Sequence, residues 1–99
     1  MKLRYTRRAL RDLLAIAAYI RPRNPAAASA VQAAIRSSID LLAHSPGMGR
    51  ERPALNARSI GVSKYPYTAY YRIEDDEVWV LHIRDNRRKP PTRDELGGT

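Results

Sequence analysis

Apolar positions recur with a helical period in the N-terminal half of the chain and alternate with polar ones in much of the C-terminal half. Residues 2–5 alternate over a short stretch, which predicts an edge strand. From Arg7 onward, apolar residues return every three or four positions, as they do on one face of a helix. Thr6 is a good N-cap for this helix, and Pro22 should end it because proline cannot donate a hydrogen bond within a helix.

A second helix should follow after about three residues, with Asn24 as its N-cap and Pro25 at its first position. A connection this short makes the two helices antiparallel neighbours. Each helix carries an apolar stripe that is expected to face the core. The stripes are Leu10, Leu13, Leu14, Ala17 and Ile20 in the first helix, and Val31, Ala34, Ile35, Ile39, Leu41 and Leu42 in the second.

Residues 45–53 contain several turn-forming residues and are expected to form a loop. Strands should follow at residues 59–62, 67–73 and 78–84, and an acidic turn at residues 74–77 should join the last two as an antiparallel hairpin. Strict alternation along the last strand puts every second side chain on the same face. Trp79, Leu81 and Ile83 should share one face, and Val78, Val80 and His82 the other.

The order β-α-α-β-β-β predicts an α+β fold, in which a helical hairpin packs on one face of a small, mainly antiparallel sheet. Ninety-nine residues suffice for a single domain, residues 1–99, with one modest core. Residues 92–99 are expected to be flexible or to form a single helical turn.

Composition excludes several kinds of site. The chain has no cysteine, so it has neither a disulfide framework nor a thiolate metal site, and its two histidines are too few and too far apart to indicate zinc. We therefore expect no metal and no cofactor. The longest apolar run has eight residues, from Leu13 to Ile20, which is too short to span a bilayer. The N-terminus lacks the pattern of a signal peptide, and we expect a soluble cytoplasmic protein without a membrane partner.

The net charge is +8, and the excess lies at the two ends of the chain. Residues 1–23 alone carry seven basic side chains and one acidic side chain. Near the other end, the apolar stretch 78–83 is followed by Arg84, Arg87, Arg88 and Lys89. This asymmetry indicates an anionic partner, either nucleic acid or an acidic protein segment. The plainer alternative is a solvated chain end.

Several short motifs, in this order and spacing, resemble the ParE branch of the RelE/ParE toxins. The motifs are Tyr5-Thr6-Arg7-Arg8-Ala9, Asp12-Leu13, Ile16 with Tyr19-Ile20, Pro46-Gly47-Met48-Gly49-Arg50, Leu55, Arg58, Val62, Tyr65, Tyr67, Tyr70-Tyr71-Arg72-Ile73, Val80-Leu81 and Arg87-Arg88. The resemblance runs from about residue 3 to residue 88. It implies the toxin of a type II toxin–antitoxin system, neutralised by a cognate ParD-like antitoxin, with the fold already predicted from periodicity.

The superfamily implies two competing activities. ParE-like members act on DNA gyrase without hydrolysis, whereas RelE-like members cut mRNA on the ribosome. Cleavage needs an acid, a base and cations for the developing phosphorane charge. Thr68 stands where the strand arginine of RelE-like members is expected, no tyrosine follows Tyr71, and arginines are poor proton shuttles. This favours a gyrase inhibitor without catalytic residues; direct nucleic-acid binding is possible but not favoured. The alternatives are a RelE-like ribonuclease and a non-toxic basic binding module.

The resemblance and the charge pattern give two sets of candidate residues. Target binding is assigned to Arg58, Arg72, Arg84, Arg87 and Arg88, and antitoxin binding to Arg7, Arg11, Leu14 and Tyr19. Arg58 has an equal alternative, which is to hold the nearby loop through backbone carbonyls. A solvated helix face is the plainer interpretation of Arg7 and Arg11. Tyr67, Tyr70 and Tyr71 are better explained as packing residues than as base-stacking platforms.

Overall fold

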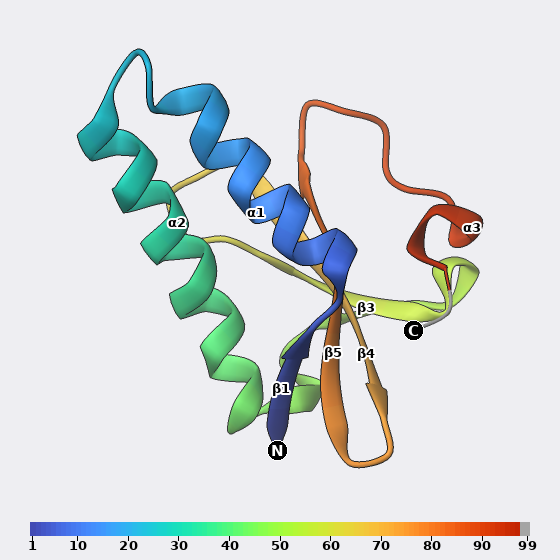
Figure 1. Cartoon of the computed structure of the whole chain (residues 1–99). Coiled ribbons are helices and arrows are strands. Elements are labelled where there is room, and N and C mark those ends of the chain that lie inside the picture. Colours follow the sequence, from blue (N-terminus) through green and yellow to red (C-terminus); the bar gives the residue numbers. More distant parts are fainter. Residues whose placement is uncertain (98–99) are drawn as a thin grey trace.

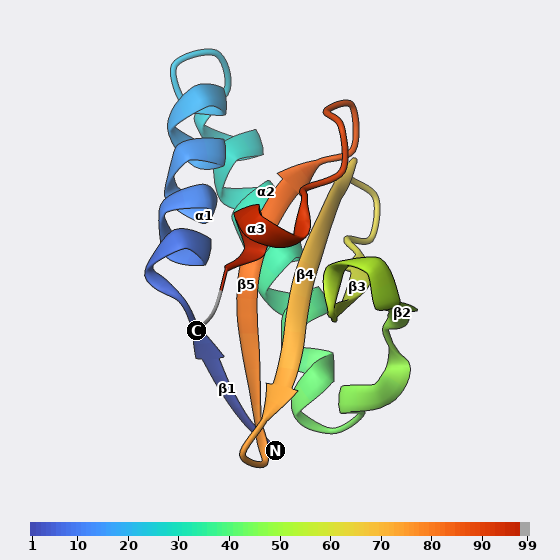
Figure 2. The same ribbon diagram turned by 90° about the vertical axis from the view of Figure 1, so that its right-hand side faces the viewer.

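A helical hairpin covers one face of a five-stranded sheet in the computed structural model, which describes residues 1–97, and a short third helix lies on the other face (Figures 1 and 2). The elements are β1 (Lys2–Tyr5), α1 (Arg7–Ile20), α2 (Pro25–Asp40), β2 (Arg50–Arg52), β3 (Ala57–Gly61), β4 (Tyr67–Glu74), β5 (Glu77–Asp85) and α3 (Arg93–Leu96), with 3-10 turns at Leu41–Ala43, Pro46–Met48 and Pro53–Leu55. The α+β expectation is confirmed.

The strand order of the sheet is β1-β5-β4-β3-β2. β1 pairs with β5 in parallel, and every other pair is antiparallel, so the sheet is mixed but mainly antiparallel. β2 lies within residues 45–53, which were expected to form only a loop, and it pairs with β3. Its three residues are too few to show a period of two, so only pairing with β3 identifies them as a strand.

Local signals place the helix boundaries correctly. The Thr6 hydroxyl accepts a hydrogen bond from the Ala9 N–H at 3.1 Å, and the Asn24 side chain accepts one from the Ala27 N–H at 3.0 Å. Both side chains satisfy a backbone donor that the first helical turn leaves without a partner. Pro25 occupies the first position of α2, as predicted.

The main core lies between the hairpin and the sheet. It contains Ala9 and Leu13 of α1, Val31, Ile35 and Ile39 of α2, Leu42, and Ile60, Val62, Tyr67, Ala69, Tyr71, Val78, Val80 and Ile83 from β3 to β5 and the loop after β3. The predicted burial is wrong for three residues of these stripes. Leu10, Leu14 and Leu41 are 42%, 64% and 54% exposed. α1 is apolar around much of its circumference, and packing buries the side that carries Ala9, Leu13 and Ala17.

The register between β4 and β5 shifts at Tyr70 and Tyr71, which pair with His82 and Val80. Leu81 is thus an extra residue on β5, as in a β-bulge, and alternation is broken there. Ile83 packs in the main core with Val78 and Val80, whereas Leu81 packs on the opposite face. For this reason, the prediction that Trp79, Leu81 and Ile83 share one face is wrong.

A smaller core on the opposite face joins Leu55, Tyr70, Leu81 and Leu96. Leu96 belongs to α3, which begins with a capping box between Thr92 and Glu95. Arg93–Leu96 therefore form a single helical turn, which is one of the two alternatives expected for this end. Residues 98 and 99 lie outside the described residues.

Candidate interaction sites

Three exposed cationic residues follow β5 and form what we call the basic end: Arg87, Arg88 and Lys89. The Asp85 carboxylate accepts a hydrogen bond from the Arg87 backbone N–H at 2.9 Å. It also accepts one from Nε of the Arg87 side chain at 3.0 Å, and this bonding lowers the pKa of Asp85. The Arg87 side chain is 74% exposed. The guanidinium is therefore oriented by its own chain and still accessible to a partner.

A cleft of about 480 Å³ separates the basic end from the second half of α1. It is lined by Asp12, Ala15, Ile16 and Tyr19 of α1, by Tyr67 and Ile83 of the sheet, and by Asp85, Arg87 and Arg88. The tertiary structure thus places Tyr19, assigned to the antitoxin, beside Arg87 and Arg88, assigned to the target. Burial raises the pKa of Tyr67, so this residue lines the cleft as a neutral phenol.

Arg84 is not part of this exposed cluster. The sequence groups it with Arg87 and Arg88, but its side chain is buried beneath α3. One terminal nitrogen lies 3.2 Å from Nε2 of His82 and 3.1 Å from Oε2 of Glu95. Its Nε is buried without a hydrogen-bond partner among residues 1–97. Arg84 holds α3 against the sheet in this structure, and only 10% of its side chain is exposed.

His82 is buried between α1 and Arg84, with 1% of its surface exposed. Nδ1 faces Oδ2 of Asp12, which also accepts a hydrogen bond from the Ile83 backbone N–H at 3.0 Å. Because a guanidinium can only donate, Nε2 of His82 is the acceptor in its contact with Arg84, and the Nδ1–H is then the donor to Asp12. The imidazole is occupied on both nitrogens, and substrate cannot reach it.

Sequence reasoning missed this buried pair. A histidine within an apolar strand and an isolated carboxylate on a basic helix are the two signals that were available. Neither could identify the other residue, because 70 positions separate them in the chain.

Arg58, which pairs with Tyr71, and Arg72, which pairs with Trp79, lie toward the turn of the β4–β5 hairpin, away from Arg87 and Arg88. Arg58 donates to the carbonyl oxygens of Gly47 and Gly49 at 3.2 and 3.0 Å. Arg58 therefore holds the nearby loop through backbone carbonyls, which was the alternative to target binding. Arg72 donates through Nε to the Asn56 carbonyl at 2.7 Å. The five residues assigned to the target therefore lie at three separate places: the basic end, the buried side of α3, and this second pair.

The residues assigned to the antitoxin all lie on α1 and are exposed. Arg7, Leu10, Arg11 and Leu14 share one side of the helix by their spacing, and we call them the α1 surface. Tyr19 lies on the adjacent side, beside the cleft, and is 65% exposed. Its hydroxyl accepts a hydrogen bond from Arg23 at 3.3 Å. The α1 surface combines exposed leucines with guanidinium groups, which suits an amphipathic acidic segment.

The tyrosines of β4 are packing residues, as interpreted from the sequence. Tyr67, Tyr70 and Tyr71 are all buried. Thr68 lies between two of them, and its hydroxyl donates to the Asn86 side chain. Thr68 therefore supplies no cation at the position expected for the strand arginine of RelE-like members.

Two classes of site are missing from the part of the chain that the structure describes. No group of three or more histidine, cysteine, aspartate or glutamate residues within residues 1–97 is arranged to hold a metal ion. Among the same residues, no helix has the length and apolar character needed to cross a membrane.

Comparison with known proteins identifies a matching protein family and a similar protein. The sequence profile of the ParE toxin of the type II toxin–antitoxin system parDE matches residues 3–90. A Sinorhizobium fredii protein, Y4kP, whose assignment as a toxin is provisional, is 40% identical over 90 residues, which are 91% of this chain and 93% of that protein.

The fold resembles chains from solved toxin–antitoxin structures. A chain of the chromosomal ParDE system of P. aeruginosa superimposes with a TM-score of 0.77 and 26% identity, covering 86% of this chain and 95% of that one. A chain of the E. coli RelBE complex gives 0.63 and 19%, covering 88% and 98%. One from the RelBE2 complex of Mycobacterium tuberculosis gives 0.56 and 24%, covering 85% and 95%. The match over residues 3–90 and the shared fold show that the chain belongs to the ParE toxin family, within the RelE/ParE superfamily of type II toxin–antitoxin systems.

Proposed function

We propose that this ParE-family toxin acts in the cytoplasm by binding DNA gyrase and blocking it, and that a ParD-like antitoxin neutralises it. The observation that carries the proposal is the basic end: two exposed arginines, Arg87 and Arg88, follow β5, which β4 holds by pairing as far as Asp85. Guanidinium groups on a rigid element lose less entropy on binding than those on a free chain. A surface of this kind binds carboxylates or phosphates.

Binding without hydrolysis is supported by the state of the titratable groups. Acid–base cleavage of RNA needs a proton-transferring group within reach of the substrate. His82 is the histidine nearest the basic residues, and it is sealed between Asp12 and Arg84. Tyr67 and Tyr71 are buried, and burial raises the pKa of both. A gyrase inhibitor without catalytic residues is therefore favoured over a RelE-like ribonuclease.

The α1 surface supports the second part of the proposal, the antitoxin. Leu10 and Leu14 are exposed between Arg7 and Arg11, and an acidic amphipathic segment that folds on contact would cover all four. Tyr19, on the adjacent side of α1, extends this surface to the cleft. The proposed partner is a protein segment rather than nucleic acid, because exposed leucines gain nothing from a phosphate backbone.

The test combines two assays on the same protein. Wild-type chain should inhibit gyrase in a DNA supercoiling assay and should produce no discrete mRNA cuts in a translating extract. The double variant Arg87→Ala with Arg88→Ala should weaken inhibition by about two to four decades, since each charge-assisted contact is worth roughly 1.5–3 kcal/mol. Its thermal melt should stay close to wild type because both side chains are exposed.

Three outcomes would contradict the proposal. Cuts within codons at the ribosomal A site would establish the RelE-like alternative. Wild-type inhibition by the folded double variant would remove the basic end from the target surface. A wild-type chain inactive in both assays, but still bound by the antitoxin, would favour the non-toxic binding module.

A further inference from the structure

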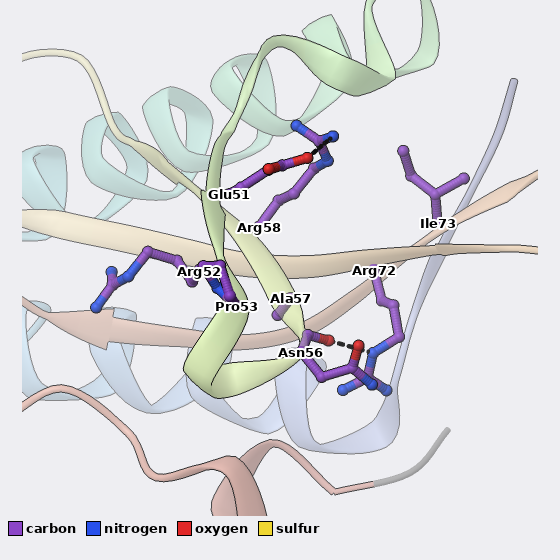
Figure 3. A pocket seen from close by; sticks show the side chains of 8 residues that line it. All are labelled: Glu51, Arg52, Pro53, Asn56, Ala57, Arg58, Arg72 and Ile73. Carbon is purple, nitrogen blue, oxygen red and sulfur yellow. Dashed lines mark hydrogen bonds and ion pairs between the residues drawn. The ribbon is translucent and has the colours of Figure 1, made fainter.

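A pocket of about 540 Å³ lies near the turn end of the β4–β5 hairpin, toward the opposite end of β5 from the basic end. It is lined by Glu51, Arg52, Pro53, Asn56, Ala57, Arg58, Arg72 and Ile73 (Figure 3). None of these residues belongs to the cleft or to the α1 surface. In Figure 3, Arg52 points away from the other two arginines. Arg58 and Arg72 are therefore the two cations that a ligand in this pocket would contact together.

The pocket lies against an open strand edge. β3 pairs with β4 only as far as Arg58 opposite Tyr71, because Asn56 takes a left-handed conformation, with φ of 51°, and turns the chain away. The Tyr67 carbonyl accepts from the N–H of Val62, so alternate residues from Tyr67 onward direct their backbone groups toward the side of β3. Ile73 is one of these residues and has no partner in the β3–β4 register, although its side chain is 38% exposed.

Both arginines are held in place by backbone carbonyls and retain further donors. Arg58 uses its terminal nitrogens for Gly47, Gly49 and Glu51, which leaves its Nε. Arg72 uses Nε for the Asn56 carbonyl and one terminal nitrogen for the Gly97 carbonyl, and that nitrogen also lies 3.6 Å from the Glu74 carboxylate, which leaves its other terminal nitrogen. Figure 3 shows Arg58 and Ile73 on one side of β4 and Arg72 on the other. Such preorganised cations lose little entropy when they bind a carboxylate.

We propose that this pocket binds an extended protein segment that carries two consecutive acidic residues beside an apolar one. A segment that pairs with the open edge at Ile73 becomes an added strand. Successive side chains of a strand point to opposite faces. One carboxylate therefore meets Arg58, its neighbour meets Arg72, and the apolar side chain covers Ile73. This interaction is independent of whether the toxin's target is gyrase.

Charge around the pocket favours a peptide over nucleic acid. Glu51 lies within the lining, and the acidic turn Glu74–Glu77 follows Ile73 directly. A nucleic acid carries a negative charge at every nucleotide and would be repelled along this path. A peptide can place its carboxylates only where Arg58 and Arg72 stand.

The test is an NMR titration of the full, ¹⁵N-labelled chain with the acetylated and amidated hexapeptide TVDEVT. Amide shifts should be largest at Ile73, Ala57 and Arg58, and exchange of the Ile73 amide should slow. The uncharged peptide TVSSVT, and TVDEVT with both central amides N-methylated, should bind at least about tenfold more weakly, because the first lacks the charges and the second lacks strand donors.

A matched pair of variants locates the site. Ile73→Glu should weaken binding of TVDEVT at least about tenfold, whereas Leu10→Glu, which adds the same charge at a residue of similar exposure, should change it less than twofold. Equal effects of the two variants would overturn the proposal, as would unchanged binding of either control peptide. Hexauridylate shifting the same amides at lower concentration would assign the pocket to nucleic acid instead. The peptide comparison on wild-type chain decides the matter even if Ile73→Glu fails to fold.

Discussion

The hydroxyl of Tyr71, on the central strand β4, accepts a hydrogen bond from the backbone N–H of Gly49 at 3.0 Å. It also donates to the Pro46 carbonyl at 2.6 Å. One buried phenol thus ties the loop between α2 and β2 to the middle of the sheet. The loop in turn provides the carbonyl oxygens that orient Arg58, so Tyr71 contributes indirectly to the arginine-lined pocket.

Gly49→Ala should destabilise the fold. A Cβ at position 49 would lie 2.7 Å from Cε1 of Tyr71, and the fully buried ring has no room to move. Overpacking of this kind costs about 1–3 kcal/mol. Urea unfolding should report the loss, with Gly47→Ala as its control, because a Cβ there meets nothing within 4 Å. Equal stability of the two variants would mean that the loop is not held by Tyr71.

Asp12→Ala should destabilise the protein by about 1–3 kcal/mol, since it leaves the buried His82 Nδ1–H and the Ile83 N–H without their acceptor. The exposed Asp40 provides a matched control, and Asp40→Ala should change unfolding by less than about 0.5 kcal/mol. The measurement is again urea unfolding. A loss no larger in Asp12→Ala than in Asp40→Ala would show that the buried pair adds nothing to stability.

Arg7→Ala with Arg11→Ala should weaken antitoxin binding and leave target inhibition intact. These arginines are exposed on α1, away from the basic end. Two lost charge contacts at a rim are worth about 0.4–2 kcal/mol, which corresponds to roughly two- to thirtyfold in affinity. Isothermal titration with the antitoxin and the supercoiling assay measure the two effects. The double variant Arg87→Ala with Arg88→Ala should instead weaken target inhibition and leave antitoxin binding intact. If both double variants weaken both activities, the antitoxin and the target share one surface.

Acid should release α3 from the sheet. The pKa of Glu95 is lowered from its ordinary 4.5 to about 2, first by the hydrogen bond from the Thr92 backbone and then by that from Arg84. A carboxyl with a lowered folded-state pKa contributes stability that is complete above its unfolded value and lost as pH falls through the folded one. The Leu96 methyl resonances should therefore shift between about pH 4.5 and pH 2.

Glu95→Gln is the control for this titration. It retains the size of the side chain but has no charge to lose, so its Leu96 resonances should vary much less over the same pH range. Identical titration curves for wild type and Glu95→Gln would mean that other carboxyl groups control the docking of α3.

Local signals in the chain were enough to predict both helices and most of the sheet. Thr6, Asn24 and Pro25 act on backbone groups within three residues of themselves, so their effect does not depend on the rest of the fold. The alternation in β4 and the first half of β5, and the acidic turn between them, are equally local. The exposed Arg87 and Arg88 were also predictable, because the two prolines after Lys89 end regular strand pairing.

The tertiary structure alone decided which residues of these elements are buried and which can meet a partner. The apolar residues around α1 exceed what one packed face can hold, so contact with α2 and β5 selects Leu13 for the core and leaves Leu14 on the surface. The bulge at Leu81 moves Ile83 to the hairpin face, and α3 folds back over Arg84. Each outcome depends on contacts between residues distant in the chain, whose energies no local pattern of residues encodes.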